Sequence, residues 1–220
     1  MRIAVLASGR GSNLQALINA IASGHLAAEI VGVFSDKPRA GALEKARNAG
    51  IAALALKPAD FASRLACDQA LFSRIDAVHP DLIVCAGYMR LVSQMQVQTR
   101  LGRMINIHPS LLPAFKGLHT HQQALDAGAP EHGASVHFVT AELDGGPVIA
   151  RARVPVQADD DAATLSARVL AREHPLLVET LRLFADRRIT LVEGHVMLDG
   201  QRIHVPLQLD QDNALHSIAD

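Results

Sequence analysis

The chain has 220 residues, of which 49% are apolar, and its formal net charge at pH 7 is -1. This length suits one large domain, or a domain with an appendage, and the small charge gives no bulk attraction to nucleic acid or to membranes. Cys67 and Cys85 form no CxxC motif, and no apolar run reaches the roughly 18 residues of a membrane span. With a strand pattern directly after Met1 and no signal-peptide core, the sequence predicts a soluble cytoplasmic protein without a disulfide framework.

The first half of the chain alternates strand patterns with helix patterns. Apolar runs predict strands at residues 3–7, 30–34, 51–56 and 81–87. Helical periodicity predicts helices at residues 14–21, 41–49 and 59–78. Such alternation produces βαβ units and a parallel sheet, so we expect a Rossmann-type first half.

A glycine-rich turn, Ser8-Gly9-Arg10-Gly11-Ser12-Asn13, joins the first expected strand to the first expected helix. Free backbone N–H groups and the helix dipole converge there and favour a bound phosphate. The alternative is a tight turn in which Ser12 or Asn13 only caps the helix. Leu14 stands where the third glycine of a dinucleotide fingerprint would be, and a Walker lysine is missing. The turn therefore suits one phosphate monoester better than a pyrophosphate.

The second half carries further strand and helix patterns. Strands are expected at residues 104–107, 133–139 and 148–154, and helices at residues 122–127 and 162–185. Short strand-like pieces follow over residues 190–206. From Gln208 to Asp220 the chain is polar and is expected to fray.

Asn106 and His108 end a buried strand pattern that Pro109 stops. Because they are two residues apart, both side chains point to one face at the strand's carboxyl end, where α/β sheets bind ligands. The alternative is an edge asparagine beside a histidine satisfied in the core. Asp144, in a glycine-flanked turn, is either a local turn carboxylate or a partner for His108.

Three further segments have both a functional and an ordinary interpretation. Tyr88 to Val92 could wall a flat heteroaromatic ligand, or could be a loop that caps the core. His119 and His121 have no carboxylate or cysteine at a zinc-site spacing, so we expect no metal site. On the pattern alone, Glu173 and His174 are expected at the surface of the last helix.

Six motifs in a fixed order resemble the folate-dependent formyltransferase superfamily. They are Gly11-Ser12-Asn13, Ala86-Gly87-Tyr88-Met89-Arg90, Asn106-Ile107-His108-Pro109-Ser110-Leu111-Leu112-Pro113, Gly117-Leu118-His119-Thr120-His121, Ser135-Val136-His137-Phe138-Val139 and Leu143-Asp144-Gly145-Gly146-Pro147. Within the superfamily, the Gly-Ser-Asn turn resembles that of the phosphoribosylglycinamide formyltransferases. The resemblance implies a Rossmann-like three-layer α/β/α fold with a mostly parallel central sheet, in a single formyltransferase domain. That domain would span residues 1–205, with a phosphate-binding half at 1–100, a catalytic half at 101–205 and a tail at 206–220.

The same resemblance implies a reaction and its residues. The formyl group of the co-substrate 10-formyltetrahydrofolate would pass to the amino group of 5′-phosphoribosylglycinamide in purine biosynthesis, in a monomer or weak homodimer with no nucleic-acid or membrane partner. The implied catalytic residues are Asn106, His108 and Asp144. The implied ribonucleotide contacts are Gly11, Ser12, Asn13 and Glu173. The implied folate contacts are Met89, Arg90, Leu91, Val92, Asn106, Thr140, Ala141 and Asp144. Separately from the resemblance, we expect Arg64 and Arg90 to pair with a folate glutamate carboxylate.

Three alternatives stay open on the sequence. A methionyl-tRNA formyltransferase would add a C-terminal RNA-binding domain, and a formyltetrahydrofolate hydrolase would add an N-terminal regulatory domain. A non-catalytic nucleotide-binding module would need Gly9 and Gly11, but would not need Asn106, His108 and Asp144 together.

Overall fold

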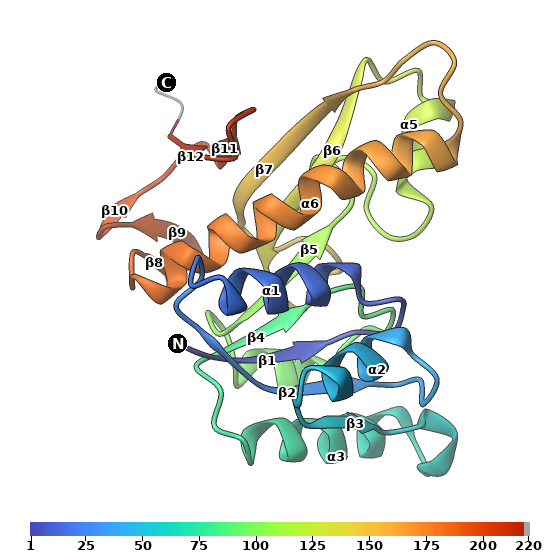
Figure 1. Ribbon diagram of the computed structural model, residues 1–220, viewed down its shortest axis with the longest axis vertical. Coiled ribbons are helices and arrows are strands. Elements are labelled where there is room, and N and C mark those ends of the chain that lie inside the picture. The colour runs from blue at the N-terminus through green and yellow to red at the C-terminus, as the bar shows by residue number, and fades with distance from the viewer. Residues whose placement is uncertain (218–220) are drawn as a thin grey trace. The chain divides into compact units, whose positions relative to one another are not determined.

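The computed structural model describes residues 1–217 and places them in two compact units. Unit 1 comprises Met1–Asn106 and Val139–Ala141, and unit 2 comprises Ile107–Phe138 and the chain from Glu142 onward. Both units contain strands and helices (Figure 1). Over residues 1–217, every helix is too short or too polar to cross a membrane.

Unit 1 is built from parallel strands with helices in the connections. Its elements in chain order are β1 (Arg2–Leu6), α1 (Ser12–Ala22), β2 (Glu29–Ser35), α2 (Gly41–Asn48), β3 (Ala53–Ala55), a 3₁₀ turn (Pro58–Asp60), α3 (Arg64–Asp76), β4 (Leu82–Cys85), α4 (Gln94–Gln98) and β5 (Met104–His108), whose last two residues belong to unit 2. The strands follow the order β5-β4-β1-β2-β3, and each neighbouring pair is parallel. The predicted α/β class with a mostly parallel sheet is therefore confirmed.

The core of unit 1 explains why these apolar runs become strands. On one face, Leu71, Phe72 and Ile75 of α3 pack into a cluster with Leu6 of β1 and Met104 of β5. Alternate residues of β1 point to the opposite face and are equally buried. A strand covered on both faces needs a continuous apolar sequence rather than an alternating one.

Helix α3 begins later than the sequence pattern indicated. The expected helix started at Ala59, but the structure has a 3₁₀ turn at Pro58–Asp60, and α3 starts at Arg64. Ser63 is the N-cap, and its Oγ accepts the N–H of Ala66 at 3.1 Å. An N-cap hydroxyl fixes the start of a helix more strongly than weak periodicity extends it. The short helix α4 was not predicted.

Unit 2 is a mixed structure. Its elements in chain order are α5 (Thr120–Asp126), β6 (Glu131–Phe138), β7 (Val148–Pro155), α6 (Ala162–Ala185), β8 (Ile189–Val192), β9 (His195–Leu198), β10 (Gln201–Arg202), β11 (Leu207–Leu209) and β12 (Leu215–His216). Strands β6 and β7 pair antiparallel, and α6 lies along them (Figure 1). Strands β8, β9 and β10 form a separate antiparallel sheet.

The expectation that the tail is frayed is wrong for residues 208–216. Strand β11 pairs in parallel with β7, and β12 pairs antiparallel with β11. Arg172 of α6 also donates to the side chain of Asn213 at 2.7 Å. These tertiary contacts order a segment whose local sequence is polar. Residues 218–220, on which part of that expectation falls, lie outside the described residues.

Candidate active site

The glycine-rich turn in unit 1 has the geometry of an anion site. Gly11 is the N-cap of α1, with φ of 75°, and no side chain caps the helix. Backbone N–H groups and the positive end of the helix dipole converge at this end of α1 and favour a bound anion. A side chain at Gly11 would place its Cβ 2.7 Å from Cα of Ala42, so both the dihedral angle and the space require glycine.

Ser8 ties this turn to the segment that follows β4. Its Oγ donates to Oδ1 of Asp36 at 2.5 Å and accepts the N–H of Met89 at 2.9 Å. The N–H of Ser8 also donates to the carbonyl of Gly87 at 2.9 Å. The two segments leave neighbouring parallel strands at their carboxyl ends, which is where α/β sheets bind ligands.

The segment after β4 exposes apolar side chains. Met89 is 61% exposed and Leu91 is 51% exposed, whereas Val92 packs against the core cluster that also receives Val139. The expected folate segments at 89–92 and 140–141 therefore belong to the same unit. Arg64, the first residue of α3, is exposed, and α3 is tied to this segment because Asp68 accepts the N–H of Ser93 at 2.8 Å.

Strand β5 carries Asn106 and His108 at its carboxyl end. Asn106 is opposite Cys85 of β4 in the parallel register. The two-residue spacing within one strand puts both side chains on the same face, as the sequence predicted. Cys85 itself is fully buried, and burial raises the pKa of its thiol to about 12, so it is no nucleophile.

In unit 2, His108 and Asp144 face each other. Nδ1 of His108 is 3.5 Å from Oδ2 of Asp144, and Nε2 of His108 is 3.0 Å from the carbonyl oxygen of Phe115. Oδ2 of Asp144 also accepts the N–H of Gly117 at 2.9 Å. Both ring nitrogens of His108 therefore face acceptor oxygens. The sequence interpretation of Asp144 as a partner for His108 matches this placement.

His137 is a member of this cluster to which the sequence assigned no role. Its Nε2 is 3.7 Å from Oδ1 of Asp144, and its Nδ1 is 2.9 Å from the carbonyl oxygen of Phe138. Burial lowers the pKa of His137, which favours the neutral ring. The available signal was the alternation of Ser135 and His137 along one face of β6, close to the carboxyl end of that strand.

Glu173 is not the surface residue that the helix pattern indicated. It lies on α6 in unit 2 and is only 8% exposed. A buried glutamate normally has a partner or a function, and contact of Glu173 with the ribonucleotide stays a prediction. The neighbouring His174 is half-buried, and burial lowers its pKa.

Two more histidines lie next to His108 without forming a metal site. The rings of His121 and His132 are 5.2 Å apart and perpendicular, and His132 is fully buried. Burial, followed by the charges of His121 and His108, lowers the pKa of His132 to about 4. Within residues 1–217, no group of three or more histidine, cysteine, aspartate and glutamate side chains is arranged to hold a metal ion.

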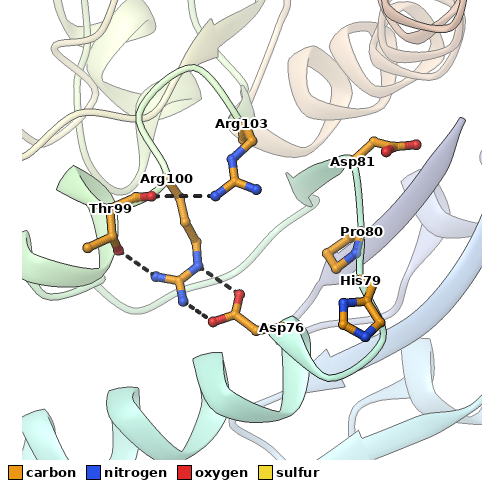
Figure 2. A pocket seen from close by; sticks show the side chains of 7 residues that line it. All are labelled: Asp76, His79, Pro80, Asp81, Thr99, Arg100 and Arg103. Carbon is orange, nitrogen blue, oxygen red and sulfur yellow. Dashed lines mark hydrogen bonds and ion pairs between the residues drawn. The ribbon is translucent and has the colours of Figure 1, made fainter.

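A cleft of about 530 Å³ opens in unit 1 at the opposite, amino-terminal ends of β4 and β5 (Figure 2). Arg100 points across it to Asp76 and forms two hydrogen bonds with that carboxylate. The guanidinium of Arg100 also donates to Gln96 at 2.7 Å and stacks on Phe72 with its carbon 4.6 Å from the ring centre. The positive charge of Arg100 is therefore paired with Asp76 inside the protein, and we assign this cleft no ligand.

Comparison with known proteins identifies close similarities. Residues 1–181 match the formyl transferase family. The chain is 50% identical over 203 residues to phosphoribosylglycinamide formyltransferase of Escherichia coli (strain K12), covering 92% of this chain and 96% of that one. It is 41% identical over 193 residues to the trifunctional purine biosynthetic protein adenosine-3 of Homo sapiens, covering 88% of this chain and 19% of that one. The solved phosphoribosylglycinamide formyltransferase of Coxiella burnetii superposes with a TM-score of 0.89 at 45% identity, covering 92% and 95% of the two chains.

Proposed function

Because the chain belongs to the formyl transferase family, we propose that it transfers the formyl group of 10-formyltetrahydrofolate to the amino group of 5′-phosphoribosylglycinamide. The products are formyl-phosphoribosylglycinamide and tetrahydrofolate, in purine biosynthesis. The proposal is supported by the names of the bacterial relatives and by the near-complete length over which they align. The structural observation that carries it is the buried His108–Asp144 pair next to the strand end that holds Asn106.

The reaction needs donors for a developing negative charge. The amine attacks the formyl carbon, and the carbonyl oxygen becomes a tetrahedral oxyanion. The carboxamide of Asn106 and the protonated ring of His108 can each donate a hydrogen bond to that oxygen. Neither a metal nor a covalent nucleophile is required for this step.

The two acceptors around His108 orient its ring N–H groups. An imidazolium satisfies Asp144 through Nδ1–H and the Phe115 carbonyl through Nε2–H, whereas a neutral ring leaves one of these acceptors without a proton. For Nε2–H to reach the oxyanion, the substrate oxygen must take the place of the Phe115 carbonyl. Asp144 keeps the ring oriented during that exchange, since its carboxylate is itself fixed by Gly117.

Asp144 and His137 offer a route for the proton that the amine must lose. The second carboxylate oxygen of Asp144 lies 3.7 Å from Nε2 of His137, so this ring helps to hold the carboxylate in place. A water between the amine and this pair would carry the proton toward the folate nitrogen that leaves. His137 then acts through Asp144, as a positioning residue.

Substrate binding is proposed at the segments described above. The backbone N–H groups of Gly11, Ser12 and Asn13 would hold the substrate phosphate, and Glu173 would contact the ribose. The folate would lie along Met89 to Val92 and Thr140 to Asp144, with Arg64 and Arg90 near its glutamate carboxylates. We further propose that residues 1–205 form the formyltransferase domain, in a cytoplasmic protein that is a monomer or a weak homodimer.

The proposal is tested by acceptor choice. Tetrahydrofolate formation from 10-formyltetrahydrofolate is followed by absorbance with 5′-phosphoribosylglycinamide, with initiator methionyl-tRNA, or with no acceptor. We expect product only with the ribonucleotide. Product with the tRNA would assign the chain to the tRNA enzymes, and product without acceptor would assign it to the hydrolases. Folate binding without turnover under all three conditions would contradict catalysis.

A further inference from the structure

Unit 2 contains a cleft of about 310 Å³ that the proposed reaction does not use. It is lined by β7, by the turn between β8 and β9, and by the segment from β10 to Pro206. Its ionisable side chains are Arg151, Arg202, His195 and His204, and no aspartate or glutamate lines it. Three separate chain segments thus bring basic side chains, and no acidic ones, to the same cleft.

Arg151 has a donor in this region that the fold does not satisfy. Its Nη2 donates to the carbonyl of Leu112, but its Nε is buried and has no hydrogen-bond acceptor among residues 1–217. Burial, and then the charge of Arg153, lowers the pKa of Arg151. A desolvated guanidinium N–H without an acceptor is unfavourable, and the same side chain lines the cleft.

Arg202 also differs from the arginines of this unit that form ion pairs with carboxylates. Arg168 is paired with Asp160, Arg188 with Asp199 and Arg153 with Glu131. Arg202, on the short strand β10, is exposed and makes no ion pair with a carboxylate in the part of the chain that the structure describes. Its positive charge is therefore not neutralised by the fold, and it lines the same cleft as Arg151.

We propose that this cleft binds a small phosphate-bearing anion, with the phosphoryl group between Arg151 and Arg202. Guanidinium groups match the oxygens of a phosphate in geometry and charge, and histidine rings add N–H donors. A hollow near 310 Å³ lies at the lower end of small-molecule pockets, so the ligand is compact. This site is distinct from the glycine-rich turn, which belongs to unit 1.

The choice of test variant follows from the contacts of Arg151. Through Leu112, its guanidinium holds the segment after His108, and the N–H of Leu112 donates to Ser135 at 3.1 Å. Replacing Arg151 would disturb that segment as well as the cleft. Arg202→Gln removes a charge without breaking an ion pair. Arg47→Gln, at an exposed position of α2 in unit 1, removes the same charge elsewhere and is the matched control.

The experiment titrates the full chain with inorganic phosphate at pH 7 and constant ionic strength, with chloride as the balancing anion. Ring resonances of His195 and His204 are followed by heteronuclear NMR, because they report this cleft and not the turn in unit 1. We expect saturable shifts in the wild-type protein and in R47Q. In R202Q the affinity should fall about tenfold or more, since one charge-assisted hydrogen bond contributes at least such a factor.

Two results would overturn the proposal. One is a shift that grows linearly and never saturates in the wild-type protein, and the other is saturation with equal affinity in R202Q and R47Q. A parallel titration with ribose 5-phosphate separates the two sources of the phosphoryl group. Tighter binding than phosphate assigns the cleft to a phosphate ester, and equal binding assigns it to free phosphate. The NMR titration measures binding and not turnover, so its result is independent of whether the protein transfers a formyl group.

Discussion

Oδ2 of Asp144 lies 3.5 Å from Nδ1 of His108, and the two side chains are only 8% and 6% exposed. The same oxygen accepts the N–H of Gly117, so the carboxylate cannot turn away from the ring without losing a backbone hydrogen bond. Charges that are this well buried are screened little by solvent or salt. A substitution that removes the charge of Asp144 should therefore lower activity more than one that changes only the shape of the side chain.

Asp144→Asn tests that expectation. Asparagine can still accept the Gly117 N–H, and it tolerates the left-handed backbone of this position, where φ is 47°. Stability should stay close to wild type, while kcat falls about 100-fold or more, the usual range for a lost acid–base function. Steady-state assays give kcat and KM, and Asp126→Asn on α5 is the control for charge. A raised KM with unchanged kcat would instead place Asp144 in binding.

Asn106→Ala removes the proposed neutral donor to the oxyanion. Loss of one such donor typically costs about 100- to 1000-fold in kcat. Asn106→Asp keeps the shape but places a carboxylate where negative charge develops, so its loss should be larger. Circular dichroism and thermal unfolding verify that both variants are folded. A folded alanine variant within roughly threefold of wild type would remove Asn106 from the oxyanion site.

Local sequence predicted the parallel framework well because its signals are short-range. The apolar runs of β1 and β4, the turn at Gly11 and the prolines after His108 each restrict the backbone by themselves. The start of α3 escaped prediction because two local signals competed. Pro58 favours a turn, and the cap at Ser63 outweighs the periodicity of the residues before it.

Features that depend on tertiary pairing could not be predicted. Strand β11 forms because Leu207 pairs with Ala150 of β7, a partner far away in the chain. His137 reaches Asp144 only because β6 and the turn before β7 fold back on each other. Burial of Glu173 likewise depends on which other segments pack against α6. Helical periodicity in the sequence does not predict those neighbours.

Gly11→Val should raise KM for the ribonucleotide while the KM for the folate changes little. The new side chain would meet Ala42 and force a left-handed backbone that valine rarely adopts. The turn would then lose the alignment of its N–H groups. Gly9→Ala is the steric control, because a Cβ there meets nothing within 4 Å. An equal loss for both substrates, with a lower melting temperature, would point to general unfolding instead.

His132 should make the protein less stable in acid. The pKa of His132 in the folded chain, about 4, lies below the ordinary value of 6.5. Between these two pH values the unfolded chain therefore binds a proton at His132 that the folded chain does not bind. The free energy of unfolding should be fully retained above about pH 6.5 and fall as the pH drops toward about 4, by at most about 3 kcal/mol from this residue. Urea unfolding across this range measures the slope. His132→Leu removes the titrating ring, so its slope should be shallower, and His25→Leu is the control. Parallel slopes for wild type and His132→Leu would show that the buried ring does not cause the acid sensitivity.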